Sequence, residues 1–228
     1  MTKNREYVVC EPESVANASI IWLHGLGANG NDFVGMIEQL GLTEDHRVRF
    51  IFPNAPFINV TVNQGMKMRG WYDIYDINIL RKEDEAGVEN THKFLTELIG
   101  HEIEQGISSE RIMLAGFSQG GAMTLYTGLR SAWPLAGMVV LSAYLPLADT
   151  FSANKYPANR STPIFMAHGL FDPVVPLHAG KKSYQQLQEQ NYNVEWVTYP
   201  MAHTIAEQEI TAIGNFINRC LVKLIPQI

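Results

Sequence analysis

Short apolar runs alternate with longer segments of helical spacing along most of the chain. The short runs are apolar on consecutive residues, which is typical of strands covered on both faces of a sheet. They predict strands over residues 19–23, 48–52, 111–115, 137–142, 163–167 and 194–199. Between them, apolar residues recur every three or four positions and predict helices over residues 32–39, 85–105, 120–131, 179–190 and 205–224. Repeated alternation of strand and helix indicates an α/β fold with a mostly parallel central sheet and helices on both faces.

The organisation of the chain favours a single domain over residues 1–228. No internal repeat, low-complexity segment or Pro/Gly/Ser-rich linker divides the sequence into parts of different composition. The 228 residues contain 46% hydrophobic and 10% aromatic side chains, which is enough to fill a sizeable core. The composition therefore excludes a disordered or collagen-like chain.

Charge and cysteine content narrow the classes of partner and compartment. The 17 lysines and arginines against 23 aspartates and glutamates give a net charge of −6, and no basic run is present, so nucleic acid is not an expected partner. Cys10 and Cys220 lie far apart without a CxxC or metal-ligand spacing, which predicts reduced structural thiols. The first residues lack the apolar core of a signal peptide, and Ser142 and Pro146 interrupt the longest apolar stretch. We therefore expect a cytoplasmic protein without stable membrane insertion.

A candidate nucleophile follows the strand predicted over residues 111–115. Gly116-Phe117-Ser118-Gln119-Gly120 fits the pattern G-x-S-x-G between a strand and a helix. A serine on such a sharp turn leaves no room for flanking side chains, hence the two glycines, and the turn lifts the hydroxyl above the sheet. The helix N-terminus behind it offers free N–H groups and a positive dipole end to a developing oxyanion. Ser118 is therefore the predicted nucleophile.

A serine hydroxyl needs a general base, which a carboxylate must orient. The order expected for this architecture is serine, then acid, then histidine. Asp172 follows the second strand predicted after Ser118 and stands 54 residues after that serine. His203 follows the last predicted strand and stands 31 residues after Asp172. Because loops at the carboxyl ends of the strands carry the chemistry in open α/β sheets, we predict that these three residues form a catalytic triad.

Two interpretations compete for the glycine-rich segment 25–30. The segment matches the dinucleotide-binding pattern G-x-G-x-x-G, after a strand and before a helix. That pattern also requires an acidic residue at the end of the next strand, and this strand instead ends in Phe52 and Pro53. We therefore favour the second interpretation, in which the segment supplies a donor to an oxyanion hole. The expected pair of donors is the backbone N–H of Leu26 and that of Gln119.

Metal and cofactor sites find little support in the sequence. His101 and Glu102 begin like the motif H-E-x-x-H, but Gln105 stands where the second histidine should be, so a surface helix face is the better interpretation. His24 and His168 each precede a glycine at a strand end, where we expect a hydrogen-bonded structural histidine. No metal and no cofactor are predicted.

Further motifs stand in a fixed order from about residue 18 to residue 216. They are His24-Gly25-Leu26-Gly27, Phe52-Pro53-Asn54-Ala55-Pro56, Trp71-Tyr72-Asp73-Ile74, the segment around Ser118, Leu141-Ser142-Ala143-Tyr144-Leu145-Pro146, His168-Gly169 with Asp172 and Val174-Val175-Pro176, and Met201 with His203. In these motifs the sequence resembles the alpha/beta-hydrolase carboxylesterases that include acyl-protein thioesterases and lysophospholipases. The resemblance implies the alpha/beta-hydrolase fold, the same triad, and Leu26 with Gln119 as the oxyanion hole.

The chain departs from this family's pattern at three positions. Pro200 and Thr204 stand where the family commonly has Gly and Ser around the catalytic histidine, and Gly70 stands where it commonly has Ser or Ala. We expect Pro200 to stiffen the histidine loop and Gly70 to loosen the segment before Trp71. None of the three changes removes a catalytic atom.

The apolar segment 54–72 is long for a connection between elements. In the family the corresponding region shapes an acyl-binding groove; the alternative is that its side chains only cover the sheet. The residues that we assign to substrate binding are Phe57, Val62, Met66, Trp71, Tyr72 and Leu170. A homodimer is left open, because an exposed apolar part of this segment would mark a partner surface.

The sequence thus predicts a serine hydrolase that cleaves carboxylic esters or thioesters through an acyl-enzyme on Ser118. Its expected partner is a small-molecule ester or an acylated substrate. A lysophospholipase would share every catalytic residue and stays an alternative. A hydrolase-fold protein that binds acylated ligands without turnover is the alternative from another functional class.

Overall fold

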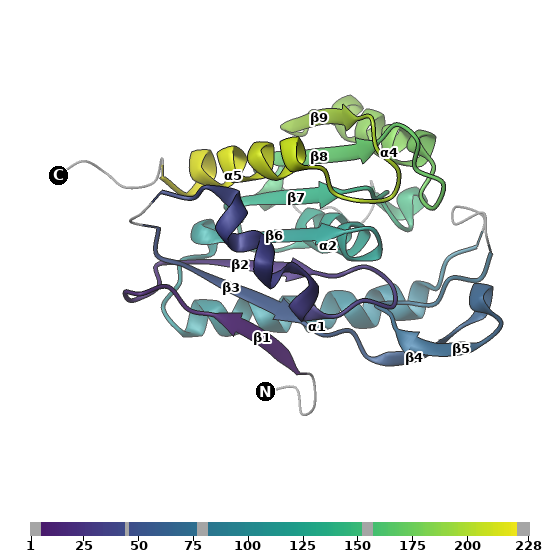
Figure 1. Ribbon diagram of the computed structural model, residues 1–228, viewed down its shortest axis with the longest axis horizontal. Helices are drawn as coiled ribbons and strands as arrows, with labels where there is room; N and C mark the ends of the chain where they lie inside the picture. Colours follow the sequence, from purple (N-terminus) through teal and green to yellow (C-terminus); the bar gives the residue numbers. More distant parts are fainter. Residues whose placement is uncertain (1–5, 44–45, 77–81, 152–156, 223–228) are drawn as a thin grey trace.

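A seven-stranded sheet forms the centre of the computed structural model, which describes residues 6–43, 46–76, 82–151 and 157–222 (Figure 1). The strands are β1 (Tyr7–Cys10), β2 (Ala18–Leu23), β3 (Val48–Pro53), β6 (Ile112–Phe117), β7 (Gly137–Leu141), β8 (Ile164–Gly169) and β9 (Val194–Tyr199). They lie in the order β1-β3-β2-β6-β7-β8-β9. Strand β1 is antiparallel to β3, and all other neighbours are parallel. The predicted α/β fold with a mostly parallel sheet is confirmed.

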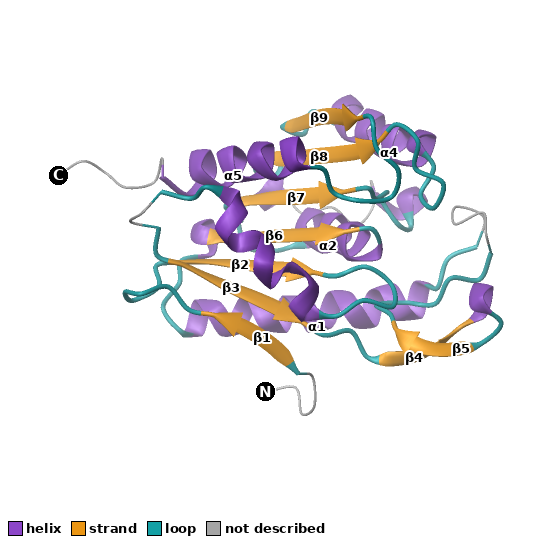
Figure 2. Cartoon of the chain, in the orientation of Figure 1, coloured by secondary structure: helices purple, strands orange, loops and turns teal. Residues whose placement is uncertain are grey.

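Helices cover both faces of this sheet (Figure 2). One face carries α1 (Glu85–Glu104), α2 (Gln119–Arg130) and α4 (Leu177–Glu189), and the other carries α5 (Glu207–Val222) and the 3₁₀ helix η1 (Gly30–Leu40). On the first face, Leu95 of α1 packs in one buried cluster with Leu114 of β6. On the second, Phe216 of α5 packs in another with Phe50 of β3. The remaining short 3₁₀ turns are η2 (Thr61–Asn63), η3 (Ser109–Arg111), η4 (Ala148–Thr150) and η5 (Pro157–Asn159).

The predicted elements are all present, with ends shifted by at most two residues within the described part of the chain. Residues 223–224 of the last predicted helix lie outside that part. The helix predicted over 32–39 is a 3₁₀ helix that begins earlier, at Gly30. It begins there because the Asn29 side chain accepts the N–H of Asn31 while the Asp32 carboxylate accepts the N–H of Asn29. Gly41, in the left-handed conformation with φ 57°, follows its last residue.

Two features were missed by the sequence pattern. Strand β1 lies at the edge of the sheet, and its residues alternate between exposed and half-buried, so it has no continuous apolar run. The segment 54–72, expected as an apolar connection, contains an antiparallel hairpin of β4 (Phe57–Val60) and β5 (Met66–Arg69). Figure 1 shows this hairpin beyond the ends to which β2, β6, β7 and β8 point. It therefore lies at the edge of the sheet where the predicted catalytic loops leave their strands.

Among the described residues, none of the helices combines the length and the apolar character that crossing a membrane would require.

Candidate active site

Ser118 occupies the sharp turn between β6 and α2. Its backbone has φ 56° and ψ −122°, a conformation that costs free energy for any residue other than glycine. The flanking glycines make the turn sterically feasible. A Cβ on Gly116 would lie 2.4 Å from the carbonyl oxygen of Gly120, and a Cβ on Gly120 would lie 2.3 Å from the carbonyl oxygen of Leu23. The glycines of the G-x-S-x-G pattern are thus required by close backbone approach.

Three side chains from distant parts of the chain form one hydrogen-bonded chain. The Ser118 hydroxyl lies 2.9 Å from Nε2 of His203, and Nδ1 of His203 lies 2.7 Å from Oδ2 of Asp172. A carboxylate only accepts, so Nδ1 carries the proton and Nε2 is left to accept from the serine hydroxyl. Both distances lie within the range expected for a nucleophile, its base and the group that orients the base. The structure therefore brings the three predicted triad residues together.

The Asp172 carboxylate is fully buried and is held on both oxygens. Oδ1 accepts the backbone N–H groups of Val174 and Val175, both at 2.9 Å, while Oδ2 faces His203. The side chain of His203 is 16% exposed and Ser118 is 9% exposed. The serine and the imidazole thus keep a small exposed fraction, whereas the carboxylate is fully buried.

The segments that carry the two predicted oxyanion-hole donors both lie next to Ser118. Gln119 is the first residue of α2, so its N–H has no acceptor within the helix. The loop that carries Leu26 passes beside the nucleophile, because a Cβ on Gly25 would lie 3.4 Å from Cβ of Ser118. In this loop Ala28 donates to the carbonyl of Gly25 and Gly27 donates to that of Arg69; the described contacts assign no acceptor to the N–H of Leu26. Both N–H groups are available to a ligand.

The glycines of segment 25–30 therefore have a structural explanation that involves no nucleotide. A Cβ on Gly30 would lie 2.5 Å from the carbonyl oxygen of Phe52, and the N–H of Gly30 donates to the side-chain oxygen of Asn54 at 2.9 Å. The start of η1 is thus packed directly onto β3.

The predicted substrate-binding residues divide into two groups. Phe57 and Met66 of the hairpin are 57% and 63% exposed, Leu170 of the loop after β8 is 42% exposed, and Val62 is half-buried. Trp71 and Tyr72 are only 2% and 3% exposed, so their side chains lie in the core, and their assignment to substrate binding stays a prediction. Their side chains support the site from within the core.

His24 and His168 are the hydrogen-bonded structural histidines that the sequence predicts. His24 donates from Nδ1 to the carbonyl of Gly25 and accepts the N–H of Ala55 on Nε2. His168 donates from Nε2 to the carbonyl of Val175. Burial lowers the pKa of both imidazoles, so both rings are neutral at pH 7.

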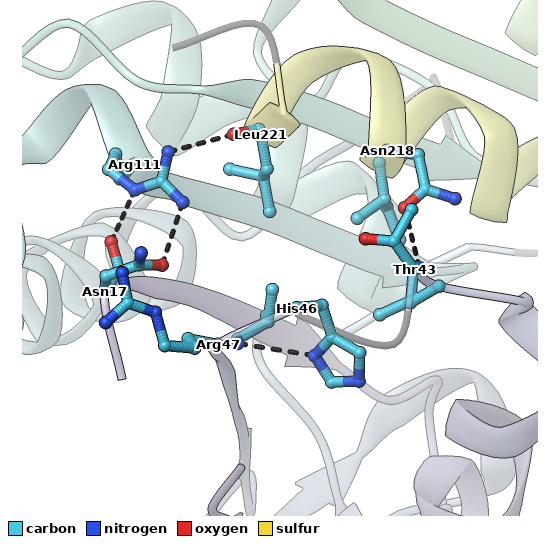
Figure 3. A pocket seen from close by; sticks show the side chains of 10 residues that line it. Asn17, Thr43, His46, Arg47, Arg111, Asn218 and Leu221 are labelled. Atoms are coloured by element: carbon cyan, nitrogen blue, oxygen red, sulfur yellow. Dashed lines mark hydrogen bonds between the residues drawn. The ribbon is translucent and has the colours of Figure 1, made fainter. Parts of the chain in front are cut away.

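A separate cavity of about 370 Å³ opens away from the triad (Figure 3). It lies at the opposite edge of the sheet, because Val48 begins β3 and Arg111 comes just before β6. The Arg111 guanidinium donates to Asn17 and to the backbone carbonyl of Leu221 across one wall of this cavity. None of the triad residues lines it.

The sheet order, the serine on a strained strand-to-helix turn, and the histidine and aspartate after later strands together define an alpha/beta-hydrolase. The family described as Phospholipase/Carboxylesterase matches residues 4–221, and the chain belongs to this family. It is a serine hydrolase that acts on esters or thioesters.

Proteins with similar sequences carry a consistent description. The chain is 43% identical over 216 residues to acyl-protein thioesterase 1 of Neurospora crassa, covering 91% of this chain and 88% of that protein. It is 39% identical over 210 residues to acyl-protein thioesterase 1 homolog 1 of Dictyostelium discoideum, covering 91% of this chain and 92% of that protein.

Solved structures agree with this assignment. The crystal structure of Arabidopsis thaliana SOBER1 has a TM-score of 0.84 at 33% identity and covers 90% of this chain and 100% of its own. The crystal structure of Zea mays acyl-protein thioesterase 2 has a TM-score of 0.85 at 25% identity and covers 95% of this chain and 99% of its own.

Proposed function

We propose that the protein removes acyl groups from acylated proteins through an acyl-enzyme on Ser118. The observation that carries this proposal is the hydrogen-bonded chain from the Ser118 hydroxyl through His203 to the buried Asp172 carboxylate. Such a chain converts a weak nucleophile into an effective one, because the base is in place and its tautomer is fixed. The relatives described as acyl-protein thioesterases support the choice of substrate.

The proposed reaction has two halves with the same geometry. Oγ of Ser118 attacks the acyl carbonyl carbon while Nε2 of His203 takes the hydroxyl proton. The tetrahedral oxyanion accepts hydrogen bonds from the N–H groups of Leu26 and Gln119, and its collapse breaks the bond to the thiol or alcohol, which takes the proton from His203. Water then attacks the acyl-enzyme, His203 takes a proton from it, and the fatty acid leaves as Ser118 regains its hydroxyl.

Exposed apolar side chains at the triad's edge of the sheet suit a substrate with a long acyl group. Phe57 and Met66 belong to the hairpin, and Leu170 belongs to the loop that carries Asp172. Each is large, apolar and exposed. Burial of each acyl CH₂ against such side chains contributes about 0.8 kcal/mol.

The test compares substrates on the same enzyme. We expect kcat/KM on aryl esters to rise from acetyl to dodecanoyl, and an S-palmitoylated peptide to be cleaved faster than a lysophospholipid of equal chain length. Ser118→Ala should lower kcat by roughly 10⁶-fold. Ser142→Ala is the matched control, since the Ser142 hydroxyl is buried and has no hydrogen-bond partner among the described residues; its activity should stay at the level of the unmodified protein.

Four outcomes would contradict the proposal. Substantial turnover by Ser118→Ala would rule out an acyl-enzyme on Ser118. Failure of a fluorophosphonate to label Ser118 would favour a binding protein without turnover. A maximum at two to four carbons would indicate a small-ester carboxylesterase, and preference for the lysophospholipid would indicate a lysophospholipase.

We also propose a cytoplasmic location. Cys10 is a half-buried free thiol, which suits a reducing compartment. Cell fractionation with an antibody to the protein tests this, and recovery in a secreted or membrane-integrated fraction would contradict it.

A further inference from the structure

Trp71 is attached to its surroundings through every polar group that it has. Its backbone N–H donates to Oε1 of Gln119 at 2.8 Å, and its indole Nε1–H donates to the backbone carbonyl of His24 at 2.8 Å. Its own carbonyl accepts the hydroxyl of Thr91 in α1 at 2.5 Å. The side chain is 2% exposed and packs face to face with Phe94, with ring centroids 6.4 Å apart. Trp71 is therefore a rigid point between three segments.

One of these segments carries the first proposed oxyanion donor. Gln119 is buried, and besides accepting from Trp71 its amide donates from Nε2 to the carbonyl of Tyr72 at 2.7 Å. These two bonds clamp the side chain of Gln119 onto the backbone of residues 71–72. Because the side chain and the N–H belong to the same residue at the start of α2, the clamp also restricts the direction of that N–H.

A second of these three segments, which begins at His24, carries the second donor. His24 stands two residues before Leu26, and its carbonyl is the one that accepts from the Trp71 indole. The His24 ring continues the connection, because it bonds to the carbonyl of Gly25 at 2.7 Å and lies against the Trp71 indole with centroids 5.1 Å apart. The loop that leads to Leu26 is thus fixed from its first residue onward.

The backbone at Gly70, just before Trp71, also packs against the Leu26 side chain. A Cβ on Gly70 would lie 2.9 Å from Cδ1 of Ile58 and 3.1 Å from Cδ1 of Leu26, and the N–H of Gly70 donates to the carbonyl of Pro56. Gly70 therefore allows close packing onto the Leu26 side chain, whereas the expectation that it loosens this segment stays a prediction.

We propose that Trp71 is a positioning residue that sets the spacing between the backbone N–H groups of Leu26 and Gln119. Its indole N–H holds the segment of one donor, and its backbone N–H holds the residue of the other. Oxyanion donors stabilise the transition state only when both point at the place where negative charge develops, and small displacements are costly. The proposal rests on the proposed function, in which these two N–H groups form the oxyanion hole.

The first test replaces the indole and keeps an aromatic ring. We expect Trp71→Phe to lower kcat about 10- to 100-fold with KM changed less than threefold, because the loss falls on the transition state. The affinity for an acyl trifluoromethyl ketone, which forms a tetrahedral oxyanion on Ser118, should fall by a similar factor. Trp22→Phe is the matched control: Trp22 lies on β2 two residues before His24, is 1% exposed, and has no partner for its indole nitrogen among the described residues. Its kcat should change less than threefold.

A second variant reaches the other end of the contact. Gln119→Met removes both side-chain hydrogen bonds and keeps the backbone N–H, and it should also lower kcat and inhibitor affinity together. If both variants act on one spacing, the double variant should lose clearly less than the product of the two single losses.

The outcomes separate this inference from the proposed function. The positioning role would be overturned if kcat were unchanged in Trp71→Phe, or if Trp71→Phe and Trp22→Phe lost kcat equally. In either case the proposed function would still stand as long as Ser118→Ala is inactive. If the loss of kcat in the double variant equalled the product of the two single losses, the idea that both residues set one spacing would be overturned. If Trp71→Phe does not fold, Gln119→Met decides alone: a loss confined to KM would overturn the proposal. Activity in Ser118→Ala would instead refute the proposed function itself.

Discussion

Nε2 of His168 lies 3.6 Å from Oδ2 of Asp172, and both side chains are fully buried. The same nitrogen donates its proton to the carbonyl of Val175 at 2.8 Å. Burial lowers the pKa of His168, which keeps its ring neutral beside the carboxylate. Asp172 therefore has two histidine neighbours with different tasks: in the proposed reaction His203 gains and loses a proton, whereas His168 holds the loop in place.

Replacing His168 by phenylalanine should destabilise the fold. The substitution removes the donor to the carbonyl of Val175, a residue that is 5% exposed, and an unsatisfied buried carbonyl costs about 1–3 kcal/mol. Urea denaturation followed by fluorescence measures the change in the free energy of unfolding. The control is His178→Phe on the exposed side of α4, expected to change it by less than about 0.5 kcal/mol. Equal midpoints for the two variants would contradict the prediction.

Replacing Asp172 by asparagine should lower kcat by about 10⁴-fold with little change in KM. An amide can donate to Nδ1 of His203, which would place the imidazole proton on Nε2, where it cannot accept from Ser118. Steady-state kinetics on an aryl ester measures this, with the exposed Asp149→Asn as the control. Retention of more than a tenth of kcat would show that the carboxylate does not orient the base.

Glu209 should make stability depend on pH. Burial raises its pKa to about 7, against the opposing effect of the hydrogen bond from the N–H of Ala206. In the unfolded chain a glutamate has a pKa of ~4.3, well below the folded value. The contribution of Glu209 to the free energy of unfolding is therefore most favourable below that pH and is lost progressively as pH rises to about 7. Glu209→Gln should therefore raise the free energy of unfolding at pH 8 by up to about 3 kcal/mol and leave it nearly unchanged at pH 4.

Chemical denaturation between pH 4 and pH 8 measures this difference. Glu207→Gln changes an exposed carboxylate two residues earlier and should give no pH-dependent difference. Parallel stability profiles for Glu209→Gln and the unmodified protein would refute the assignment.

Adding a methyl group at Gly116 should be far more costly than adding one at Gly35. A Cβ at position 116 would lie 2.4 Å from backbone atoms of Gly120, whereas a Cβ at position 35 would meet nothing within 4 Å. We expect Gly116→Ala to destabilise the protein by about 3 kcal/mol or more, and Gly35→Ala to be neutral or to stabilise it by about 0.5 kcal/mol. Thermal unfolding of the two variants tests this, and similar melting temperatures would contradict it.

The parts of the fold that a local pattern specifies could be predicted from the sequence. Strands such as β7, buried on both faces, are apolar at every residue, and α1 repeats its apolar residues with helical spacing. Strand β1 has one exposed and one half-buried face, so its pattern is weak. Its place in the sheet depends on pairing with β3, some forty residues further along the chain, which no local pattern reveals.

The same distinction applies to the site. Ser118, Asp172 and His203 could be placed because each follows a strand in a set order. Whether an aromatic residue is exposed or buried depends on packing against distant residues, so the burial of Trp71 could not be predicted from its motif. The side chain of Gln119 carries no motif of its own, so its bonds to residues 71–72 emerge only from the structure.

The order of the strands also sets when the enzyme can work. Strands β7 and β8 separate β6, which leads to Ser118, from β9, which leads to His203. At ~4.8 Å per neighbouring pair this is roughly 14 Å across the sheet, and the histidine loop must return over that span to come within 2.9 Å of the serine. During synthesis Ser118 is thus added to the chain long before His203, which would activate it in the proposed mechanism. In the proposed mechanism, hydrolysis therefore requires that the last strand, β9, has already joined the sheet.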